Sequence, residues 1–460
     1  MMSTKQQSGN KIILAIVLSV LTYWLFAQSF INISTPVQQT YQTTPGIINL
    51  SVSITSFATG IFMVGAGDVS DKIGRLKMTY LGIILSIIAS LLIIISDITT
   101  LLIIGRIIQG ISAAILLPAT VGVLKDQFEG KDLRKAISYL MIGTVGGVGI
   151  ASLVGGFIAT YINWQSNFIL SIIIAIIAFV LLLGTKEEAK EVIDNRPFDY
   201  IGMLIFAVLI GSITLFATQG FEQGWTSPFS ITCGSVFIIS VIVFYFFERR
   251  KRAPFIDFAL FRNRGLVGSS LVNFVLNTGI GVTTVFNIYA QTELGLTPFQ
   301  SGLVTVPYVI MAVLMVRLGE KISLRHGGKP MLLVGPLFPA IGIIFASLTV
   351  LPSDWYIAAV TFGFVIFAIG NGLCATPGLT VAILTIPDEK IGLASGLYKM
   401  TSSLGGAFGI AMNTTIFAAV QVTHSASASV AATWSFIASI MLMIIGVILA
   451  QIIIPKNIKA

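Results

Sequence analysis

GRIIQGISAAILLP, residues 105–118, places a single arginine in a stretch that is otherwise almost entirely apolar. Arg106 lies about six residues inside the apolar run that begins near residue 100, roughly 9 Å from its end if the run is helical. An ionised side chain at that depth in a bilayer is costly unless it has polar partners, and such residues usually serve function. The stretch therefore predicts a membrane-spanning helix whose arginine needs partners from elsewhere in the chain.

The composition predicts that lipid is the solvent for the whole fold. Of the 460 residues, 55% are hydrophobic and 10% are charged, and the mean hydropathy is +0.94. Soluble domains carry about 25% charged residues. A span needs about 20 mostly apolar residues, and lipid forces its backbone to be helical. We predict fourteen spans, at residues 12–33, 46–65, 78–95, 100–121, 135–159, 165–185, 199–219, 229–247, 266–290, 299–318, 330–350, 355–378, 392–421 and 430–454.

The distribution of basic residues tests this count and orients the chain. If the N-terminus is cytoplasmic, 26 of the 27 lysines and arginines fall in cytoplasmic loops or at cytoplasmic helix ends, and the remaining one is Arg106. Positive charge concentrates on the cytoplasmic side of membrane proteins. We therefore predict fourteen helices with both termini in the cytoplasm, and attribute the net charge of +8 to topology rather than to nucleic-acid binding.

Two similar basic loops indicate an internal repeat. GDVSDKIGRLK at residues 67–77 follows the second span, and GEKISLRHGGK at residues 319–329 follows the tenth. Repeats of a multi-helix unit are common in transporters. We expect an N-terminal six-helix bundle at residues 1–190, two inserted helices with their linkers at 191–265, and a C-terminal six-helix bundle at 266–460.

Four motifs, in order and at the expected spans, carry a family resemblance. GDVSDKIGR at 67–75 resembles the signature loop of the major facilitator superfamily, and RIIQG at 106–110 resembles its fourth-span motif. YAQ at 289–291 followed by GLTP at 295–298, and GLASG at 392–396, resemble the ninth-to-tenth span junction and the thirteenth span of the fourteen-span drug:proton antiporters. The resemblance covers almost the whole chain and implies an all-α integral membrane protein that acts as a multidrug efflux pump.

Two departures from the family pattern concern proton coupling. Ala151-Ser152 stands where the fifth-span antiporter motif usually has Gly-Pro, and Ala27 stands where many relatives have a first-span Asp. The small residues of the fifth span nevertheless allow close helix packing. Beside that packing role, we expect a flexible seam between the bundles, made by Gly147, Ser152, Gly155 and Gly156.

Proton coupling through Arg106 requires an acidic partner. Under the predicted topology, fifteen of the nineteen acidic residues fall in inner loops or at inner helix ends. Of the rest, Glu293 at the outer end of span nine and Glu222 after span seven are the candidates, because a carboxyl turned inward is desolvated and its pKa rises. The alternative is a structural arginine bonded to backbone carbonyls, with both glutamates solvated in loops.

The resemblance implies that the loop after the second span is a conformational latch. Asp71 would cap a helix of the other bundle while basic residues hold the loop, which favours the outward-facing state. Glycine permits the tight turn that this loop needs. The predicted latch residues are Gly67, Asp68, Asp71, Gly74 and Arg75. A solvated turn is the alternative.

Polar and aromatic side chains within the spans are candidates for a substrate cavity. Several of them recur on one helical face, as the amides of span nine do. Aromatic walls suit flat, lipophilic and often cationic compounds. Interhelical hydrogen bonding or core packing is the alternative. The predicted cavity residues are Trp24, Gln28, Asn32, Gln109, Asn273, Asn277, Thr284, Phe286, Asn287 and Tyr308.

These features predict proton-driven export of lipophilic, often cationic drugs across the bacterial plasma membrane by alternating access. A dedicated exporter of one metabolite or antibiotic and a proton-coupled uptake symporter are the alternatives. The chain has no Walker loop and no HExxH motif, which argues against ATP as the direct fuel and against a metalloenzyme. We expect no cofactor and no metal, with protons as the coupling ion. The expected partners are small lipophilic drugs or dyes, protons and membrane lipid but no nucleic acid, and the expected state is a monomer.

Overall fold

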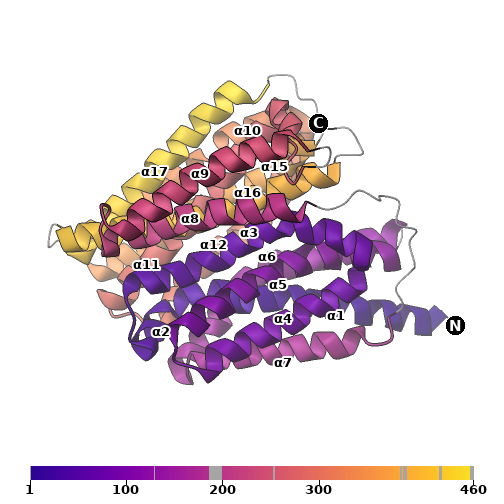
Figure 1. The fold of residues 1–460 in the computed structure, drawn as a ribbon. Coiled ribbons are helices and arrows are strands. Elements are labelled where there is room, and N and C mark those ends of the chain that lie inside the picture. The colour runs from indigo at the N-terminus through magenta and orange to yellow at the C-terminus, as the bar shows by residue number, and fades with distance from the viewer. Residues whose placement is uncertain are drawn as a thin grey trace.

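The computed structural model describes residues 2–128, 130–185, 199–251, 254–383, 386, 391–423 and 427–455, and some side chains within its helices are not described. The described residues are almost entirely helical (Figure 1). The elements are α1 (Met2–Asn32), α2 (Ser34–Tyr41), α3 (Pro45–Ile73), α4 (Arg75–Ile95), α5 (Thr99–Gln127), α6 (Gly130–Tyr161), α7 (Gln165–Leu182), α8 (Tyr200–Gln223), α9 (Pro228–Arg249), the 3-10 helix η1 (Phe258–Arg262), α10 (Arg264–Thr278), α11 (Ile280–Thr292), α12 (Pro298–His326), α13 (Gly328–Val334), α14 (Leu337–Ala346), α15 (Ser353–Ile383), α16 (Ile391–Thr423) and α17 (Ala428–Ile453).

Each of the fourteen predicted spans coincides with one helix or with two consecutive helices. Twelve segments of the described residues are long and apolar enough to cross a bilayer, and Gly9–Tyr23 within α1 is a shorter apolar segment. The ninth span is divided into α10 and α11 at Gly279, and the eleventh into α13 and α14 at Gly335-Pro336. Proline removes a backbone donor and clashes with the preceding turn, which explains the second division.

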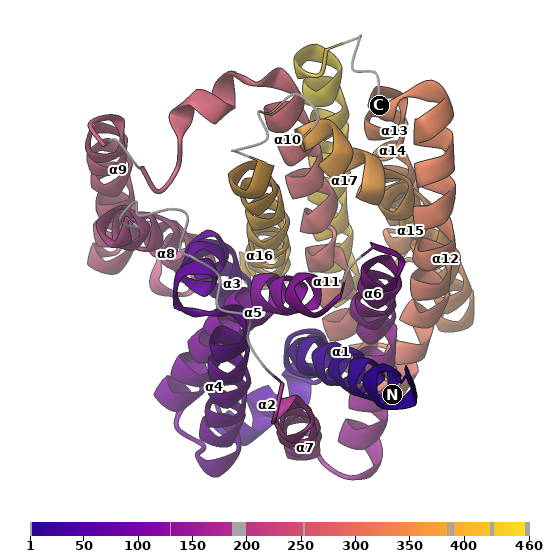
Figure 2. The same cartoon turned by 90° about the vertical axis from the view of Figure 1, so that its right-hand side faces the viewer.

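Two groups of helices pack side by side. In the first, α1 contacts α6 and α7, and α5 contacts α3 and α4; in the second, α15 contacts α12 and α14, and α16 contacts α10, α11 and α17. The two groups meet where α3 lies along α16 and where α6 lies along α12 (Figure 2). The start of α1 and the end of α17 lie at the same end of the helices (Figure 1).

The helices α8 and α9 lie outside both groups. They pack against each other, and α8 also contacts α3 of the first group and α16 of the second (Figure 2). Only 22% of each apolar window in these two helices is buried within the protein. Their remaining apolar side chains, such as Ile238 and Ile239 of α9 at 59% exposed, therefore face lipid.

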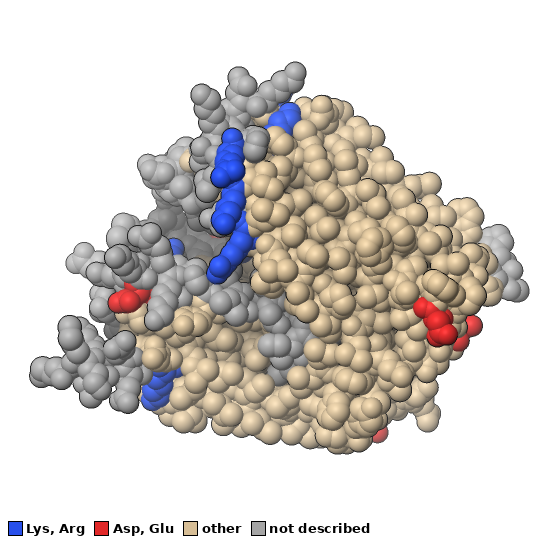
Figure 3. Space-filling view, turned by 180° about the vertical axis from the view of Figure 1, so that it is seen from behind, with Lys and Arg blue, Asp and Glu red and all other residues tan. Residues whose placement is uncertain are grey.

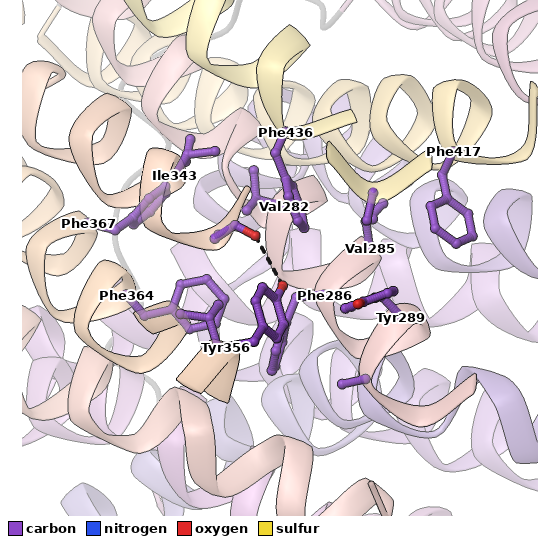
Figure 4. Close-up of a cluster of buried hydrophobic side chains, with 14 of the residues drawn as sticks. Val282, Val285, Phe286, Tyr289, Ile343, Tyr356, Phe364, Phe367, Phe417 and Phe436 are labelled. Carbon is purple, nitrogen blue, oxygen red and sulfur yellow. Dashed lines mark hydrogen bonds between the residues drawn. The ribbon is translucent and has the colours of Figure 1, made fainter. Parts of the chain in front are cut away.

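The second group is held by a core of fully buried aromatic and branched side chains. Phe286 of α11 lies at 5.3 Å and 90° from Phe364 of α15, measured between ring centroids and ring planes. Tyr356 is also fully buried, and its hydroxyl donates a hydrogen bond to the carbonyl of Ala346 at 3.1 Å (Figure 4). Such edge-to-face aromatic contacts fix the relative rotation of α11 and α15.

Charge is distributed unevenly along the helix direction. A row of lysine and arginine side chains lies towards the end where α1 begins, whereas acidic side chains are visible at both ends of the same face (Figure 3). Among the exposed basic residues of α12 are Arg317, Lys321 and Arg325, one turn apart. The positive-inside rule associates such an end with the cytoplasm. The cytoplasmic location of the termini stays a prediction.

Candidate functional site

Arg106 is almost completely buried, with 1% of its surface exposed. Its Nε donates to the carbonyl of Ser51 on α3 at 2.8 Å, and its Nη1 donates to Oε1 of Gln109 at 2.8 Å, one turn further along α5. The guanidinium carbon lies 4.1 Å from the centroid of the Phe30 ring on α1. A desolvated cation over an aromatic face gains about 2 kcal/mol. Three helices of the first group therefore converge on this one charge.

Close packing of α3 on α5 creates this environment. A methyl group on Gly110 would lie 2.6 Å from Cβ of Ala58, so only glycine lets α3 approach so closely. Thr55 donates to the carbonyl of Arg106 and Thr59 to the carbonyl of Gly110, each at 3.1 Å. These bonds join the two backbones on both sides of the guanidinium and hold it in place.

Tyr23 and Ser51 belong to this site although neither was predicted for it. Tyr23 of α1 is 9% exposed, hydrogen-bonds Thr59, and lies close enough to Arg106 to interact with its charge. Ser51 contributes its backbone carbonyl, which no residue type can signal. The sequence offered one signal for Tyr23, a polar side chain in the apolar first span. It could not show whether Tyr23 or the neighbouring Trp24 faces Arg106, because that depends on the rotation of α1 about its axis.

The two predicted acidic partners of Arg106 are not shown beside it. Glu293 is the C-terminal capping residue of α11 and its side chain is exposed, so it is not turned inward in this conformation. The side chain of Glu222, near the end of α8, lies outside the described ones. Of the contacts described for the guanidinium, the Ser51 carbonyl is of the kind that the alternative interpretation expects, and the Gln109 side chain is an additional acceptor. A proton-coupling role for either glutamate stays a prediction.

The turn between α3 and α4 is at Gly74, one of the two glycines predicted for it, and the other, Gly67, lies within the helix instead. Gly74 has a φ of 124°, a region that favours glycine, and it caps both helices. Arg75 reaches back to α5, where its Nη1 bonds Oδ1 of Asp126 at 2.9 Å and the carbonyl of Gly122 at 3.4 Å. Gly67 lies within α3, and the side chains of Asp68 and Asp71 are outside the described ones. The latch role is untested.

The predicted cavity residues fall into three classes. Trp24 and Gln28 have side chains outside the described ones. Asn32, Gln109, Thr284, Phe286 and Asn287 are buried in this conformation, and Phe286 belongs to the aromatic core, so we correct its expected exposure to a cavity. Asn273, Asn277 and Tyr308 are partly exposed.

The partly exposed polar side chains form hydrogen bonds within the second group. Nδ2 of Asn273 donates to the carbonyl of Tyr398 on α16 at 2.8 Å, and Nδ2 of Asn277 donates to the carbonyl of Asn273 at 2.8 Å. Asn371 of α15 donates to the Tyr308 hydroxyl at 2.9 Å. The Asn273 and Asn371 bonds are interhelical contacts, the alternative interpretation for such residues, whereas the Asn277 bond stays within α10. A role in substrate binding stays a prediction.

The glycines of α6 divide between the two sides of that helix. A methyl group on Gly155 would overlap Cβ of Ser29 on α1, within the first group. A methyl group on Gly156 would lie 2.7 Å from the carbonyl oxygen of Pro298 and 3.0 Å from Cα of Phe299, at the start of α12. Gly147 is buried, and the side chain of Ser152 is outside the described ones. Gly156 therefore lies at the contact between the two groups.

Further bonds join the groups at this end, which is opposite to the N-terminus. The amide of Phe299 donates to Oγ1 of Thr160 at 3.1 Å, and Nε2 of Gln291 donates to the carbonyl of Asn32 at 2.7 Å. These contacts connect α6 with α12 and α1 with α11. The two groups are thus in direct contact at the end that the predicted topology places outside the cell.

Comparison with known proteins agrees with this architecture. A family model described as Major Facilitator Superfamily matches residues 12–410. The chain is 41% identical over 452 residues to the quinolone resistance protein NorB of Staphylococcus aureus strain MRSA252, covering 98% of this chain and 97% of that protein.

Solved structures show the same fold at low identity. A POT family transporter in complex with 5-aminolevulinic acid has a TM-score of 0.72 and 14% identity, over 98% of this chain and 97% of that one. A mutant of the nucleoside transporter NupG has a TM-score of 0.69 and 11% identity, over 95% and 99%. The fourteen spans, the buried arginine and the family match lead to one conclusion: the chain is an integral membrane protein that belongs to the major facilitator superfamily.

Proposed function

We propose that this protein exports lipophilic drugs, quinolones among them, across the bacterial plasma membrane in exchange for protons. The observation that carries the proposal is the 41% identity to a quinolone resistance protein over nearly the full length of both chains. The match covers 98% of this chain, so it extends over both helix groups. The proposal assigns the chain to transport rather than to catalysis.

The physical requirement for such a pump is a device that exchanges proton binding for drug binding. Arg106 supports this role because its charge is withdrawn from water and bonded to acceptors on two helices. A carboxylate or an anionic drug group that enters the site would compete for the guanidinium with the Ser51 carbonyl and Gln109. Protonation of the carboxylate would end that competition. Glu293 and Glu222 are the proposed carriers of this proton.

The driving force in this proposal is the electrochemical gradient of protons. Each charge that crosses the membrane gains about 2.3 kcal/mol per 100 mV of potential. Alternating access would then require the contacts between α6 and α12 to open. Gly156 and Phe299 are the contact that must separate, because here the backbone of one group touches that of the other.

The test is proton flux in liposomes that contain the purified protein. With a pH gradient imposed, adding a fluoroquinolone to wild-type vesicles should release protons from the compartment that takes up drug. Arg106→Ala vesicles should show no release. Proton movement in the same direction as the drug would instead establish a symporter. Flux with one compound of a chemically diverse panel would establish a dedicated exporter.

A further inference from the structure

Two further buried ionisable residues, Asp199 and Glu248, lie far from Arg106 in the sequence, where α8 begins and α9 ends. Asp199 caps the N-terminus of α8 and is 6% exposed; Glu248 lies in the last turn of α9 and is 1% exposed. The two helices pack side by side, which brings the two carboxyl groups together. Buried carboxyls normally have donors for each oxygen, since an unsatisfied buried polar atom costs about 1–3 kcal/mol.

Of the four carboxyl oxygens of Asp199 and Glu248, two have hydrogen-bond donors among the described residues. Oδ1 of Asp199 accepts from the backbone N–H of Gly202 at 2.8 Å and from Nζ of Lys251. Oε2 of Glu248 accepts from the backbone N–H of Ile256 at 3.0 Å. Lys251 is held over the ring of Phe247, with Nζ 4.1 Å from the centroid. Asp199 therefore has a cationic partner, Lys251, whereas the partner of Glu248 is a neutral backbone N–H.

The other two oxygens face each other. No donor among the described residues reaches Oδ2 of Asp199 or Oε1 of Glu248. A methyl group on Gly202 would overlap Oε1 of Glu248 and lie 2.7 Å from Oδ2 of Asp199, so both oxygens border the same small space. Two carboxylates that border the same small space repel each other strongly where the dielectric constant is low. One proton between them removes the repulsion and supplies the missing donor.

We propose that Asp199 and Glu248 bind one shared proton and form a proton-binding site at the junction of α8, α9 and the segment that leads to η1. Asp199 is the carboxylate of the pair. Burial alone would raise its pKa, but Lys251 and the N–H of Gly202 outweigh burial and bring the pKa of Asp199 below its usual range. Glu248 then holds the proton and donates it to Oδ2 of Asp199.

The surrounding charges are consistent with a single proton. With Lys251 protonated, Asp199 ionised and Glu248 neutral, the trio carries no net charge, and loss of the proton leaves a buried negative charge. Other charged groups lie on the elements around the pair: Arg249 and Arg250 are exposed at the end of α9, Asp257 bonds the N–H of Ala259, and Lys399 is exposed on α16. The side chains of Asp68, Asp71 and Lys72 on α3, and Arg252, lie outside the described ones.

The site is placed to affect how the inserted helices join the second group. Glu248 accepts a hydrogen bond from the N–H of Ile256, which lies in the chain segment that connects α9 to η1 and α10. Loss of the proton would place a second negative charge beside Asp199 and push the end of α9 away from the start of α8. The shared proton therefore stabilises the contact between the end of α9 and the start of α8. This role does not depend on how α8 and α9 take part in transport.

Infrared spectroscopy of the purified full-length protein tests the site without any transport assay. The wild type near neutral pH should show a carboxylic-acid C=O band that Glu248→Gln lacks, since the carboxyl that remains, Asp199, is bonded to Lys251. Asp199→Asn should also lose it, since the introduced amide can donate to Oε1 of Glu248 in place of the proton. The matched control Asp354→Asn removes an exposed carboxyl of α15 and should keep the band. A band that survives in both pair variants would overturn the proposal.

A second variant keeps the proposal testable if the first two do not fold. Lys251→Met removes the positive charge that favours the deprotonated pair, so the band should persist to higher pH than in the wild type. An unchanged titration midpoint in Lys251→Met, or no protonated carboxyl in the wild type near neutral pH, would show that the pair does not share a proton. Failure of drug export would leave these readouts unaffected.

Discussion

Arg106 and the Asp199–Glu248 pair are both ionisable groups withdrawn from water, but the fold satisfies them differently. Arg106 finds acceptors in the Ser51 carbonyl and Gln109. The carboxyl pair lacks donors for two of its oxygens among the described residues. A guanidinium carries five donors, and helix carbonyls can accept a second hydrogen bond. N–H groups inside a helix are already used, and only those at an N-terminus, such as the Gly202 N–H, are available to a carboxylate. A buried cation is therefore easier to accommodate than a buried anion, and the anion binds a proton.

The largest expected effect comes from breaking the cationic site. Arg106→Ala removes two hydrogen bonds to a charged group, each worth about 1.5–3 kcal/mol, so drug-dependent proton flux should fall to background while the protein still reaches the membrane. Arg106→Lys keeps the charge but cannot bond Ser51 and Gln109 in the same planar geometry. It should restore little flux. Wild-type flux in Arg106→Ala would remove the site from the transport mechanism.

The next effect comes from filling the space between the two carboxyls. Gly202→Ala should lower the free energy of unfolding by about 1–3 kcal/mol through overpacking, because its methyl group would overlap Glu248. Gly211→Ala is the matched control, since it lies on the same helix with nothing within 4 Å. Thermal unfolding in detergent measures both. Equal midpoints for the two variants would contradict the close approach of Asp199 and Glu248.

A smaller effect should appear in the pH dependence of stability. The pKa of Asp199 is lower in the folded protein than its ordinary value of about 3.9. Its stabilising contribution is therefore present above that ordinary value and is lost as the pH falls through the lower folded value. Asp199→Asn should flatten this acidic limb of a plot of unfolding temperature against pH. The same limb in wild type and variant would show that another carboxyl produces it.

The smallest effect is expected from an ion pair with access to water. Arg75 is bonded to Asp126 at 2.9 Å, and the Arg75 side chain is 21% exposed. Asp126→Asn should cost about 0.2–1 kcal/mol, the range for exposed pairs. Thermal unfolding at low and high salt measures this cost, which should shrink as salt screens the pair. A loss as large as that of Gly202→Ala would mean that this pair stabilises the fold as much as the close packing at the Asp199–Glu248 site does.

The spans were predictable because their signal is local. Each of the fourteen predicted segments is apolar over the length of a bilayer, and each coincides with one helix or two. The divisions at Gly279 and Gly335-Pro336 were not predicted, since each segment has the length expected of one span. Gly74 was correctly placed in a tight turn, because its φ of 124° is a conformation that glycine tolerates.

The partners of the buried charges were less predictable. Arg106 was recognised from its apolar neighbours, but the expected inward turn of Glu293 is not seen, and its side chain is exposed. Phe286 was expected at a cavity and lies in the aromatic core instead. Each of these outcomes depends on helix rotation, which a near-uniform apolar sequence does not encode.

The sequence by itself determined the membrane as solvent, the number and position of the spans, the family and the presence of one buried arginine. These follow from composition and short motifs, because transfer of a segment into lipid depends on that segment alone. Only the tertiary structure decided which atoms satisfy Arg106, and that Asp199 and Glu248, 49 positions apart, face each other. Contacts between helices depend on rotation and depth to within a few ångströms, and packing of the whole bundle sets both.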